Sequence, residues 1–302
     1  MQARSNFGRA PNIRKISRDD LRLTARRYSS EITQIALSSR FTRMQRFNVT
    51  CYLVGDVLID TGFTKIGSLI GELLGETPIS AIACTHSHED HAGNCQLLGN
   101  QHRCPVLLAR PESRWEEGVG KLPLYRRIWF GSPPPYVARE MPEVVEGERT
   151  RLRAIPIPGH SATHTAFFSE NDGTLFAGDL FISSGVTAVM RHENPYASIE
   201  SLRRAAALSP RRLLNGHGLI LDRPAKILAE KAQKIEDAAG QAVRLHEQGL
   251  SDRAIQRRVF PSGGIKDRVI EIGTAGEFSR LNFVRACIRH HQLGAPGKRE
   301  ND

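Results

Sequence analysis

The stretch THSHEDHAGN, residues 85–94, constrains the fold of this chain more than any other feature. It follows the apolar run ISAIAC, typical of a buried strand, and precedes AGNCQLLG, which begins like a helix. His86 and His88 are two residues apart, so both can point out of the carboxyl end of the strand. Asp90 and His91 follow where the chain turns. Four ligand-type residues spaced H-x-H-x-D-H predict a metal site rather than a solvated surface or a satisfied turn. We expect Glu89 to face solvent.

Imidazole and carboxylate ligands suit divalent zinc, with iron and manganese as alternatives. One such motif cannot complete a two-metal site, so further ligands are expected at other strand ends. PGHSATH, FAGDL and NGHG each follow a predicted strand downstream, and LIDTG ends one upstream. These motifs contribute Asp60, His160, Asp179 and His217. Each is a weak signal alone, but together and in this order they are a strong one.

Charge and cysteine content indicate which partners and which cellular compartment to expect. The formal net charge of +10 and a pI near 9.7 favour anionic partners such as nucleic acid, phosphates or an anionic membrane surface, although many basic proteins are merely soluble. Five cysteines without a C-x-x-C pair argue against a disulfide framework and for a reducing, cytoplasmic setting. No stretch approaches the ~20 apolar residues of a membrane span, and no secretory signal is visible. The arginine-rich start leaves a disordered basic tail and an organelle transit peptide open.

The order of the predicted elements divides the chain into three parts. Residues 1–30 form a basic extension with a weak helical pattern near DDLRLTARRY. Residues 31–222 alternate strands and helices, and residues 223–302 are mainly helical. The segment 111–141 interrupts this alternation with several prolines and the aromatic residues Trp115, Tyr125, Trp129 and Phe130. Such a segment is either a lid over the site or a surface excursion packed by its own aromatics.

The ordered motifs resemble those of the metallo-β-lactamase superfamily over roughly residues 32–221. The resemblance implies an α/β fold, a four-layer αβ/βα sandwich with metals at one edge of its two facing sheets. The smaller, mainly helical C-terminal module is similar to the winged-helix-like extension of the lactamase-like endoribonucleases. Asn94 stands where many glyoxalase II enzymes have a second glycine, so a glyoxalase-like thioester activity stays open.

The resemblance also implies the role of each ligand. It predicts two divalent ions, the first held by His86, His88 and His160 and the second by Asp90, His91 and His217. Asp179 would bridge them, Asp60 would order the metal-binding loops, and His164 would either support a ligand or face the substrate.

Departures from the family pattern exclude several branches. Antibiotic-degrading members with a zinc-bound cysteine have Cys in place of Asp179, and flavodiiron relatives have Glu in place of His88. Only a helix-length segment separates Asp179 from His217, which excludes the nucleases with a large inserted domain.

The predicted ligand set indicates hydrolysis. Two metals about 3.5–4 Å apart can share a water and lower its pKa toward neutrality. The resulting hydroxide would attack a carbonyl carbon or phosphorus. Asp90 would both bind metal and orient the nucleophile, and His164 is a second candidate catalytic residue. We therefore expect a metal-dependent hydrolase acting on a small-molecule thioester, ester or lactone.

Two other functions remain open. The alternative enzyme is a phosphodiesterase or endoribonuclease, supported by the charge and by arginine pairs such as Arg257–Arg258, although these can equally be solvated surface. A catalytically silent binding protein is the third hypothesis, against which the complete ligand set argues. A small-molecule substrate is the expected partner and RNA the alternative. No membrane partner is expected, and a homodimer is left open.

Overall fold

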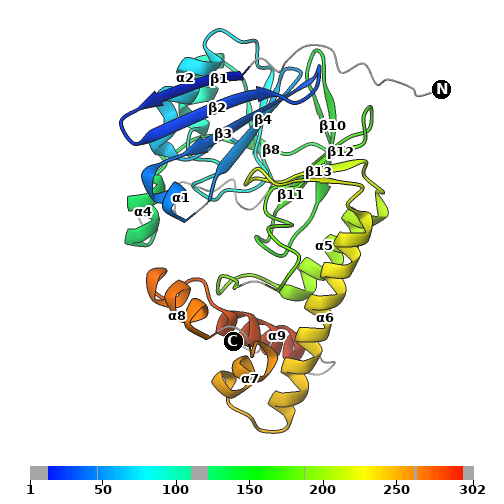
Figure 1. Ribbon diagram of the computed structural model, residues 1–302. Helices are drawn as coiled ribbons and strands as arrows, with labels where there is room; N and C mark the ends of the chain where they lie inside the picture. The colour runs from blue at the N-terminus through cyan, green and yellow to red at the C-terminus, as the bar shows by residue number, and fades with distance from the viewer. Residues whose placement is uncertain (1–12, 46, 110–121, 187, 262–263, 295–302) are drawn as a thin grey trace, which may run out of the picture.

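The computed structural model describes residues 13–45, 47–109, 122–186, 188–261 and 264–294, with the backbone alone for 264–267 and 294. Two β-sheets face each other between layers of helices (Figure 1). The first sheet has its strands side by side in chain order: β1 (Ile13–Arg18), β2 (Leu21–Arg27), β3 (Ile32–Ser38), β4 (Val49–Val54), β5 (Val57–Ile59), β6 (Ala81–Ala83), β7 (Val106–Leu108) and β8 (Arg139–Glu140). β1 to β5 pair antiparallel, and β5 to β8 pair parallel.

The second sheet completes the sandwich. Its order is β14-β13-β12-β11-β10-β9, built from β9 (Val144–Glu146), β10 (Arg151–Pro156), β11 (Thr165–Ser169), β12 (Thr174–Phe176), β13 (Arg212–Leu214) and β14 (Ile220–Asp222). The pairing of β12 with β13 is parallel and the others are antiparallel. Parallel pairs matter here because their carboxyl ends meet at the same edge of a sheet.

Alternating side chains assign each strand to two cores. Val57 and Ile59 of β5 face the second sheet, where they pack in one cluster with Phe167 and Phe176. Leu58, between them, faces the opposite way into the cluster beneath the helices of the first sheet. Successive strand side chains point to opposite faces, so a strand buried on both sides is apolar throughout. Each large side chain buried in this way contributes about 1.5–3 kcal/mol.

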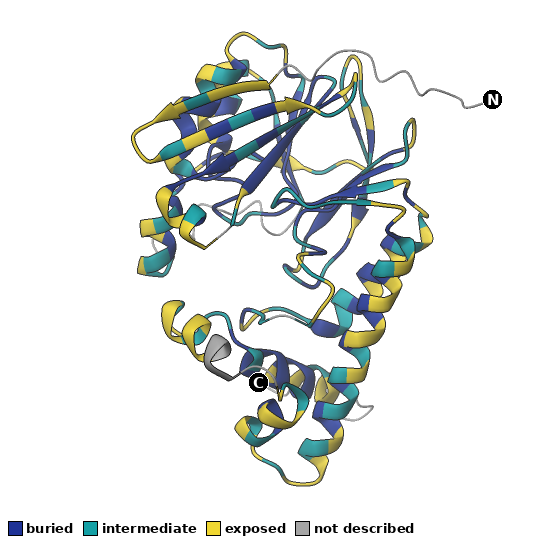
Figure 2. Ribbon diagram, viewed as in Figure 1, coloured by how far each residue is buried: buried dark blue, intermediate teal, exposed yellow. Residues whose placement is uncertain are grey.

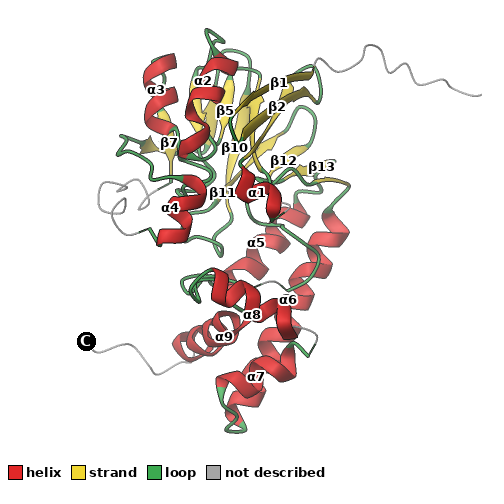
Figure 3. Cartoon of the chain, turned by 60° about the vertical axis from the view of Figure 1, so that its left-hand side comes forward, coloured by secondary structure: helices red, strands yellow, loops and turns green. Residues whose placement is uncertain are grey.

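Helices cover the outer face of each sheet (Figure 3). The first sheet carries η1 (Thr64–Ile66), α2 (Gly67–Leu74) and α3 (Cys95–His102), with α1 (Arg40–Met44) and α4 (Leu124–Phe130) near the edge where the expected ligands lie. The second sheet carries α5 (Pro195–Ala207) and α6 (Ala225–Glu247). Asn194 begins α5, because its side chain accepts hydrogen bonds from the next two backbone N–H groups, of Tyr196 and Ala197. The four-layer α/β sandwich is therefore confirmed.

The C-terminal part is helical, as expected. α6 extends beyond the second sheet and packs against α7 (Asp252–Val259) and α9 (Arg280–Gly294), with α8 (Gly264–Gly273) before the last turn (Figure 1). Phe283 and Cys287 of α9 share a core with α5 and α6, whereas α8 is mostly exposed (Figure 2). Among the described residues after Asp222 no strand is present, so the expected wing is not seen there. Over the same described ranges, no helix has the length and apolar content to cross a bilayer.

The N-terminal segment differs from the expectation. The helical pattern near residues 19–28 is wrong, because β2 occupies most of that stretch and pairs with both β1 and β3. Leu23 and Ala25 are buried, whereas Arg22 and Arg26 on either side of them are exposed, an alternation that a helix could not place on one face. Residues 13–27 are thus ordered in the sheet rather than a disordered tail, and the expected boundary at residue 30 falls between β2 and β3. Residues 1–12 lie outside the described part.

Candidate metal centre

All seven expected ligands follow strands that end at one edge of the sandwich. The histidine motif follows β6, Asp179 follows β12, His217 follows β13, and His160 lies between β10 and β11. The loops after β5 and β6 are joined by a parallel bridge between Gly62 and Ala92. The parallel pairs β5–β6 and β12–β13 therefore bring residues far apart in sequence to a single place.

Three imidazoles converge in the first group. His86 Nε2 lies 2.9 Å from His88 Nδ1, which lies 3.0 Å from His160 Nε2. The three side chains offer ligand atoms that are all within 4.8 Å of one another. The ring of His86 is fully buried, whereas His160 retains 14% of its side-chain exposure. The group is thus closed toward the core and open on its outer side.

The second group adds one carboxylate, and another lies between the two groups. Asp90, His91 and His217 also place one ligand atom each within 4.8 Å of the others. The Asp179 carboxylate lies between the two groups, with Oδ1 3.1 Å from His217 Nε2 and 3.3 Å from His91 Nε2. Its Oδ2 lies 3.4 Å from His160 Nε2. The arrangement therefore brings together every expected ligand, with Asp179 in the position of a shared one.

The outward ring nitrogens show which atoms remain available for a metal. His91 Nδ1 lies 2.8 Å from the Asp60 carboxylate, and His217 Nδ1 lies 2.8 Å from the backbone oxygen of Asn48. His86 Nδ1 lies 3.0 Å from the Thr85 hydroxyl. A nitrogen facing a carboxylate or a carbonyl must carry the proton of a neutral imidazole, so the lone pairs of His91 and His217 are on Nε2, inside the cluster.

Buried polar atoms without hydrogen bonds, and the negative charge of the nearby carboxylates, both fit a site for divalent cations. Buried His91 Nε2 and Asp179 Oδ1 make no hydrogen bond, which is uncommon for buried polar atoms. Burial lowers the pKa of His86 and His88 well below the ordinary value, so both offer lone pairs. Burial also opposes protonation of His91, but the carboxylates of Asp179, Asp90 and Asp60 outweigh it and raise that pKa. The carboxylates thus favour positive charge where the imidazole lone pairs meet.

Two glycines allow this close approach. A Cβ at Gly216 would lie 2.4 Å from His91 Cε1, and one at Gly178 would lie 2.5 Å from His164 Nε2. Gly178 also has a positive φ of 46°, which side chains rarely adopt. Residues with side chains would displace the imidazoles at both places.

His164 supports the cluster from beneath. It is 1% exposed, and its Nε2 accepts a hydrogen bond of 3.2 Å from the backbone N–H of Asp179. Burial lowers its pKa to about 3, so the ring is neutral at neutral pH. Of the two alternatives left by the sequence, this position matches support of a ligand.

Glu193 was missed by the sequence analysis. Its Oε2 lies 3.5 Å from His160 Nδ1, and its Oε1 accepts a 2.8 Å hydrogen bond from the backbone N–H of Met190. A carboxylate behind a metal-binding histidine fixes the ring and raises its basicity. Sequence offered only a weak signal, an acidic residue directly before the helix-capping Asn194.

The expectation that Glu89 faces solvent is wrong. Glu89 is fully buried, and both of its carboxylate oxygens accept 2.6 Å hydrogen bonds from Arg126. A buried carboxylate needs such a partner because an unpaired charge is costly to bury. The available signal was the pair Arg126–Arg127 within an aromatic helix.

The expected lid is only partly described. Tyr125, Trp129 and Phe130 belong to α4, with Tyr125 and Trp129 in edge contact at 5.6 Å, whereas Trp115 lies outside the described residues. His192 lies next to the first ligand group, with its ring centre 6.1 Å from that of His88. His192 is exposed, so it is available to a bound molecule.

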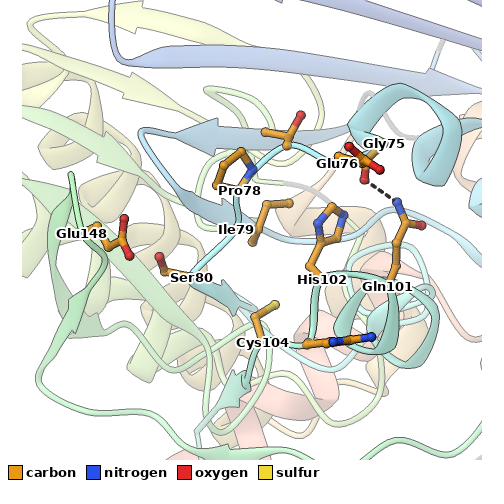
Figure 4. Close-up of a pocket in the computed structure, with 11 residues that line it drawn as sticks. Gly75, Glu76, Pro78, Ile79, Ser80, Gln101, His102, Cys104 and Glu148 are labelled. Atoms are coloured by element: carbon orange, nitrogen blue, oxygen red, sulfur yellow. Dashed lines mark hydrogen bonds between the residues drawn. The ribbon is translucent and has the colours of Figure 1, made fainter.

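A surface pocket of about 600 Å³ lies away from the cluster (Figure 4). Ile79, Ser80 and Cys104 line it, directly before β6 and β7. It is therefore at the amino ends of these strands, whereas the histidines are at the carboxyl ends, where open α/β sheets usually bind ligands.

Comparison with known proteins agrees with this geometry. Over 219 residues the chain is 29% identical to the uncharacterized protein YobT of Bacillus subtilis, covering 62% of this chain and 91% of YobT. It is 29% identical over 195 residues to the beta-lactamase-like protein 2 homolog of Drosophila melanogaster, covering 57% and 59%. It is 28% identical over 188 residues to an atrochrysone carboxyl ACP thioesterase of Aspergillus fumigatus, covering 60% and 54%. The chain thus spans little more than half the length of the last two relatives.

Solved structures show the same fold. A beta-lactamase domain protein from Burkholderia ambifaria aligns with a TM-score of 0.65 at 18% identity, covering 92% of this chain and 90% of that one. The C-terminal helices are therefore largely included in the shared fold. A structure described as a di-iron-bound form aligns with a TM-score of 0.50 at 28% identity, covering 60% and 92%. The family model of the metallo-beta-lactamase superfamily matches residues 44–217, and the chain belongs to that superfamily of hydrolases.

Proposed function

We propose that this chain hydrolyses small-molecule thioesters with two divalent ions, zinc first and iron or manganese as alternatives. His86, His88 and His160 would hold one ion, and Asp90, His91 and His217 the other, with Asp179 shared. The observation that carries this proposal is the convergence of imidazole lone pairs around the unsatisfied Asp179 Oδ1.

The bound ions would lower the pKa of a water and polarise the attacked carbonyl. The protein residues provide position and charge. Asp60, Asn48 and Glu193 hold the outer nitrogens of three of the histidines, so their inner nitrogens stay directed at one place. Asp90 is one of the less buried ligands, with 10% of its side chain exposed, and is the residue best placed to accept a proton from an incoming nucleophile.

Two observations favour a thioester over the other carbonyl substrates. A thiol has an ordinary pKa near 8.5, so its thiolate can leave without a strong acid beside the cluster. The second is the similarity to a protein named as an acyl-carrier-protein thioesterase. Esters and lactones remain substrates of the same mechanism, with a poorer leaving group.

The alternative is phosphodiester hydrolysis on RNA. Arg257 and Arg258 are exposed side by side on α7, which favours it. Two other arginines nearby are already paired: Arg253 donates two hydrogen bonds to Glu271, and Arg285 donates one to Asp252. Arg257 and Arg258, even with the exposed Arg268, would release few counterions on binding a phosphate backbone. We therefore place thioester hydrolysis first.

The deciding experiment compares substrates on one preparation. Zinc-loaded protein is assayed with S-acyl pantetheines, matched oxygen esters, lactones, bis(p-nitrophenyl) phosphate and single-stranded RNA, with Asp179→Ala as the inactive control. Thioester turnover that Asp179→Ala abolishes is expected. Metal-dependent RNA cleavage without thioester turnover, lost in Arg257→Ala/Arg258→Ala, would reverse the order of the two proposals.

We also propose a reducing compartment such as the cytoplasm. All five cysteines are free thiols, and Cys84 Sγ and Cys95 Sγ lie 3.3 Å apart without a bond. Such a close pair is expected to stay reduced where the surroundings are reducing. Thiol counting on protein extracted under acid quenching should give five free thiols.

A further inference from the structure

Arg126 of α4 occupies a buried position between two carboxylates from distant parts of the chain. Its Nε and Nη2 each donate a 2.6 Å hydrogen bond to Glu89, and its Nη1 donates a 2.9 Å hydrogen bond to Glu277. The exposed fractions of these side chains are 10% for Arg126, 0% for Glu89 and 20% for Glu277. A planar guanidinium can donate two parallel hydrogen bonds to one carboxylate while a third N–H reaches the other, a fixed fork that an ammonium lacks.

The first partner belongs to the turn that carries the ligands. Glu89 stands between His88 and Asp90, so fixing its side chain restrains the backbone of one expected ligand of each ion. Both oxygens of Glu89 are held by Arg126, which makes this contact bidentate and directional. A shift of this carboxylate would move both neighbouring ligands.

The second partner belongs to the C-terminal part. Glu277 lies between α8 and α9, and its carboxylate also accepts a hydrogen bond from the hydroxyl of Tyr125, the neighbour of Arg126 on α4. α4 is therefore attached to this turn by two consecutive side chains. Figure 1 shows α4 and α8 on opposite sides of the space between the sandwich and the C-terminal helices.

The same C-terminal turn also reaches the other side of the cluster. The backbones of Ser279 and Val189 exchange hydrogen bonds of 3.1 and 3.2 Å, and Asn282 Nδ2 donates to the Val189 oxygen. Val189 lies four residues before Glu193, whose carboxylate is 3.5 Å from His160 Nδ1. The turn thus contacts one segment on each side of the expected metal centre.

We propose that Arg126 is a positioning residue that fixes the His88–Asp90 turn and attaches the C-terminal turn 274–282 to it. Through this attachment the C-terminal helices set the access of substrate to the metal centre. The kinetic part rests on the proposed function, but the metal affinity and the attachment itself do not.

An ordinary buried ion pair would behave differently. Replacing both members of such a pair by neutral groups often restores stability, because no uncompensated charge remains. Stability alone therefore cannot identify a positioning role. The informative quantities are zinc affinity, KM relative to kcat, and hydrogen exchange of the attached segments.

The experiment uses the full chain and four variants. Glu277→Gln weakens only the C-terminal attachment, and Arg126→Lys keeps the charge. Glu89→Gln/Arg126→Met removes the most deeply buried pair of charges, while Glu277, whose side chain is 20% exposed, keeps the Tyr125 hydroxyl as a partner. Arg203→Met is the matched control, because Arg203 pairs with Glu200 and Glu236 on exposed helix surfaces away from the cluster. Each variant is measured for zinc affinity by chelator competition, for amide exchange without metal, and for thioester kinetics.

We expect Glu277→Gln to raise exchange in α4 and in residues 274–282 and to change KM at least threefold, with zinc affinity kept within about twofold. Arg126→Lys and the double variant should lose about tenfold or more in zinc affinity, the usual effect of removing support for metal ligands. The double variant should remain folded, so a loss there cannot be ascribed to unfolding. Arg203→Met should change none of these quantities.

Unchanged zinc affinity and exchange in both Arg126→Lys and the double variant would overturn the proposal and leave an ordinary ion pair. If wild-type protein hydrolyses no thioester, the proposed function fails. The zinc and exchange measurements would still decide the role of Arg126.

Discussion

Exchanging Asp60 for asparagine should weaken one metal ion selectively. Asp60 is buried, and its Oδ1 accepts a 2.7 Å hydrogen bond from the backbone N–H of Thr85 while its Oδ2 lies 2.8 Å from His91 Nδ1. Its φ is +59°, a conformation that asparagine adopts more readily than most residues. Asp60→Asn therefore preserves shape and backbone, removes one negative charge and changes the hydrogen-bonding pattern.

The amide cannot satisfy both neighbours as the carboxylate does. The N–H of Thr85 cannot move its proton, so the amide oxygen should face Thr85 and the amide NH₂ should face His91. His91 must then accept at Nδ1 and carry its proton on Nε2, the atom that faces Asp179 at 3.3 Å. A protonated Nε2 cannot bind metal. Loss of such support costs about 10- to 100-fold in metal affinity, or about 1.4–2.8 kcal/mol.

Zinc titration of chelator-treated protein in competition with a chromophoric chelator measures this loss. We expect two affinities in wild type and, in Asp60→Asn, one unchanged and one weakened 10- to 100-fold. Asp56→Asn is the matched control, because Asp56 is equally buried and accepts from Ser80 and from the N–H of Glu148 without contacting a histidine. Two unchanged affinities in Asp60→Asn, or an equal loss in Asp56→Asn, would refute the tautomer reasoning.

Two further changes test other features of the structure. Gly216→Ala should reduce bound zinc from about two ions per chain to about one, because its Cβ would lie 2.4 Å from His91 Cε1, whereas Gly185→Ala, with open space around it, should retain both. Elemental analysis of each variant checks this, and two ions in Gly216→Ala would contradict it. Burial lowers the pKa of Lys231 to about 8, so its charge destabilises the fold by roughly 3 kcal/mol below that pH. Lys231→Met should therefore raise the free energy of unfolding at pH 7. The unfolded chain binds more protons than the folded one between pH 8 and 10.5, so wild type gains stability over this range and the advantage of the variant should disappear. Urea unfolding at pH 7 and 10.5 measures the difference, and a pH-independent gain would contradict the sign.

The ligands were predictable because their signals are local. Most follow a short apolar strand, and the carboxyl ends of parallel strands meet at one edge, so residue type and place in the pattern carried the information. His160, after the antiparallel strand β10, was recognised from its proline–glycine turn. The same locality explains why the C-terminal part was correctly expected to be helical, since the apolar residues of α6 recur at helical spacing.

The residues that sequence reasoning misplaced depend on distant partners. Glu89 is a charged residue among polar neighbours, which is typical of a solvent-exposed position. Its burial is compensated by the ion pair with Arg126, which lies 37 positions away in the sequence. Glu193 is likewise recognised only beside His160. β2 was a different error: Leu21, Leu23 and Ala25 alternate with polar residues at the period of a strand, but the stretch was interpreted as a weak helical pattern.

Metal content tests the central claim most directly, because the convergence of imidazoles on Asp179 has little physical reason without cations. Protein purified without chelators is analysed for zinc, iron and manganese and compared with Asp179→Ala prepared in parallel. We expect close to two divalent ions per wild-type chain and a clear loss in the variant. Trace metal in wild type that zinc addition does not raise toward two ions per chain would contradict the dinuclear centre.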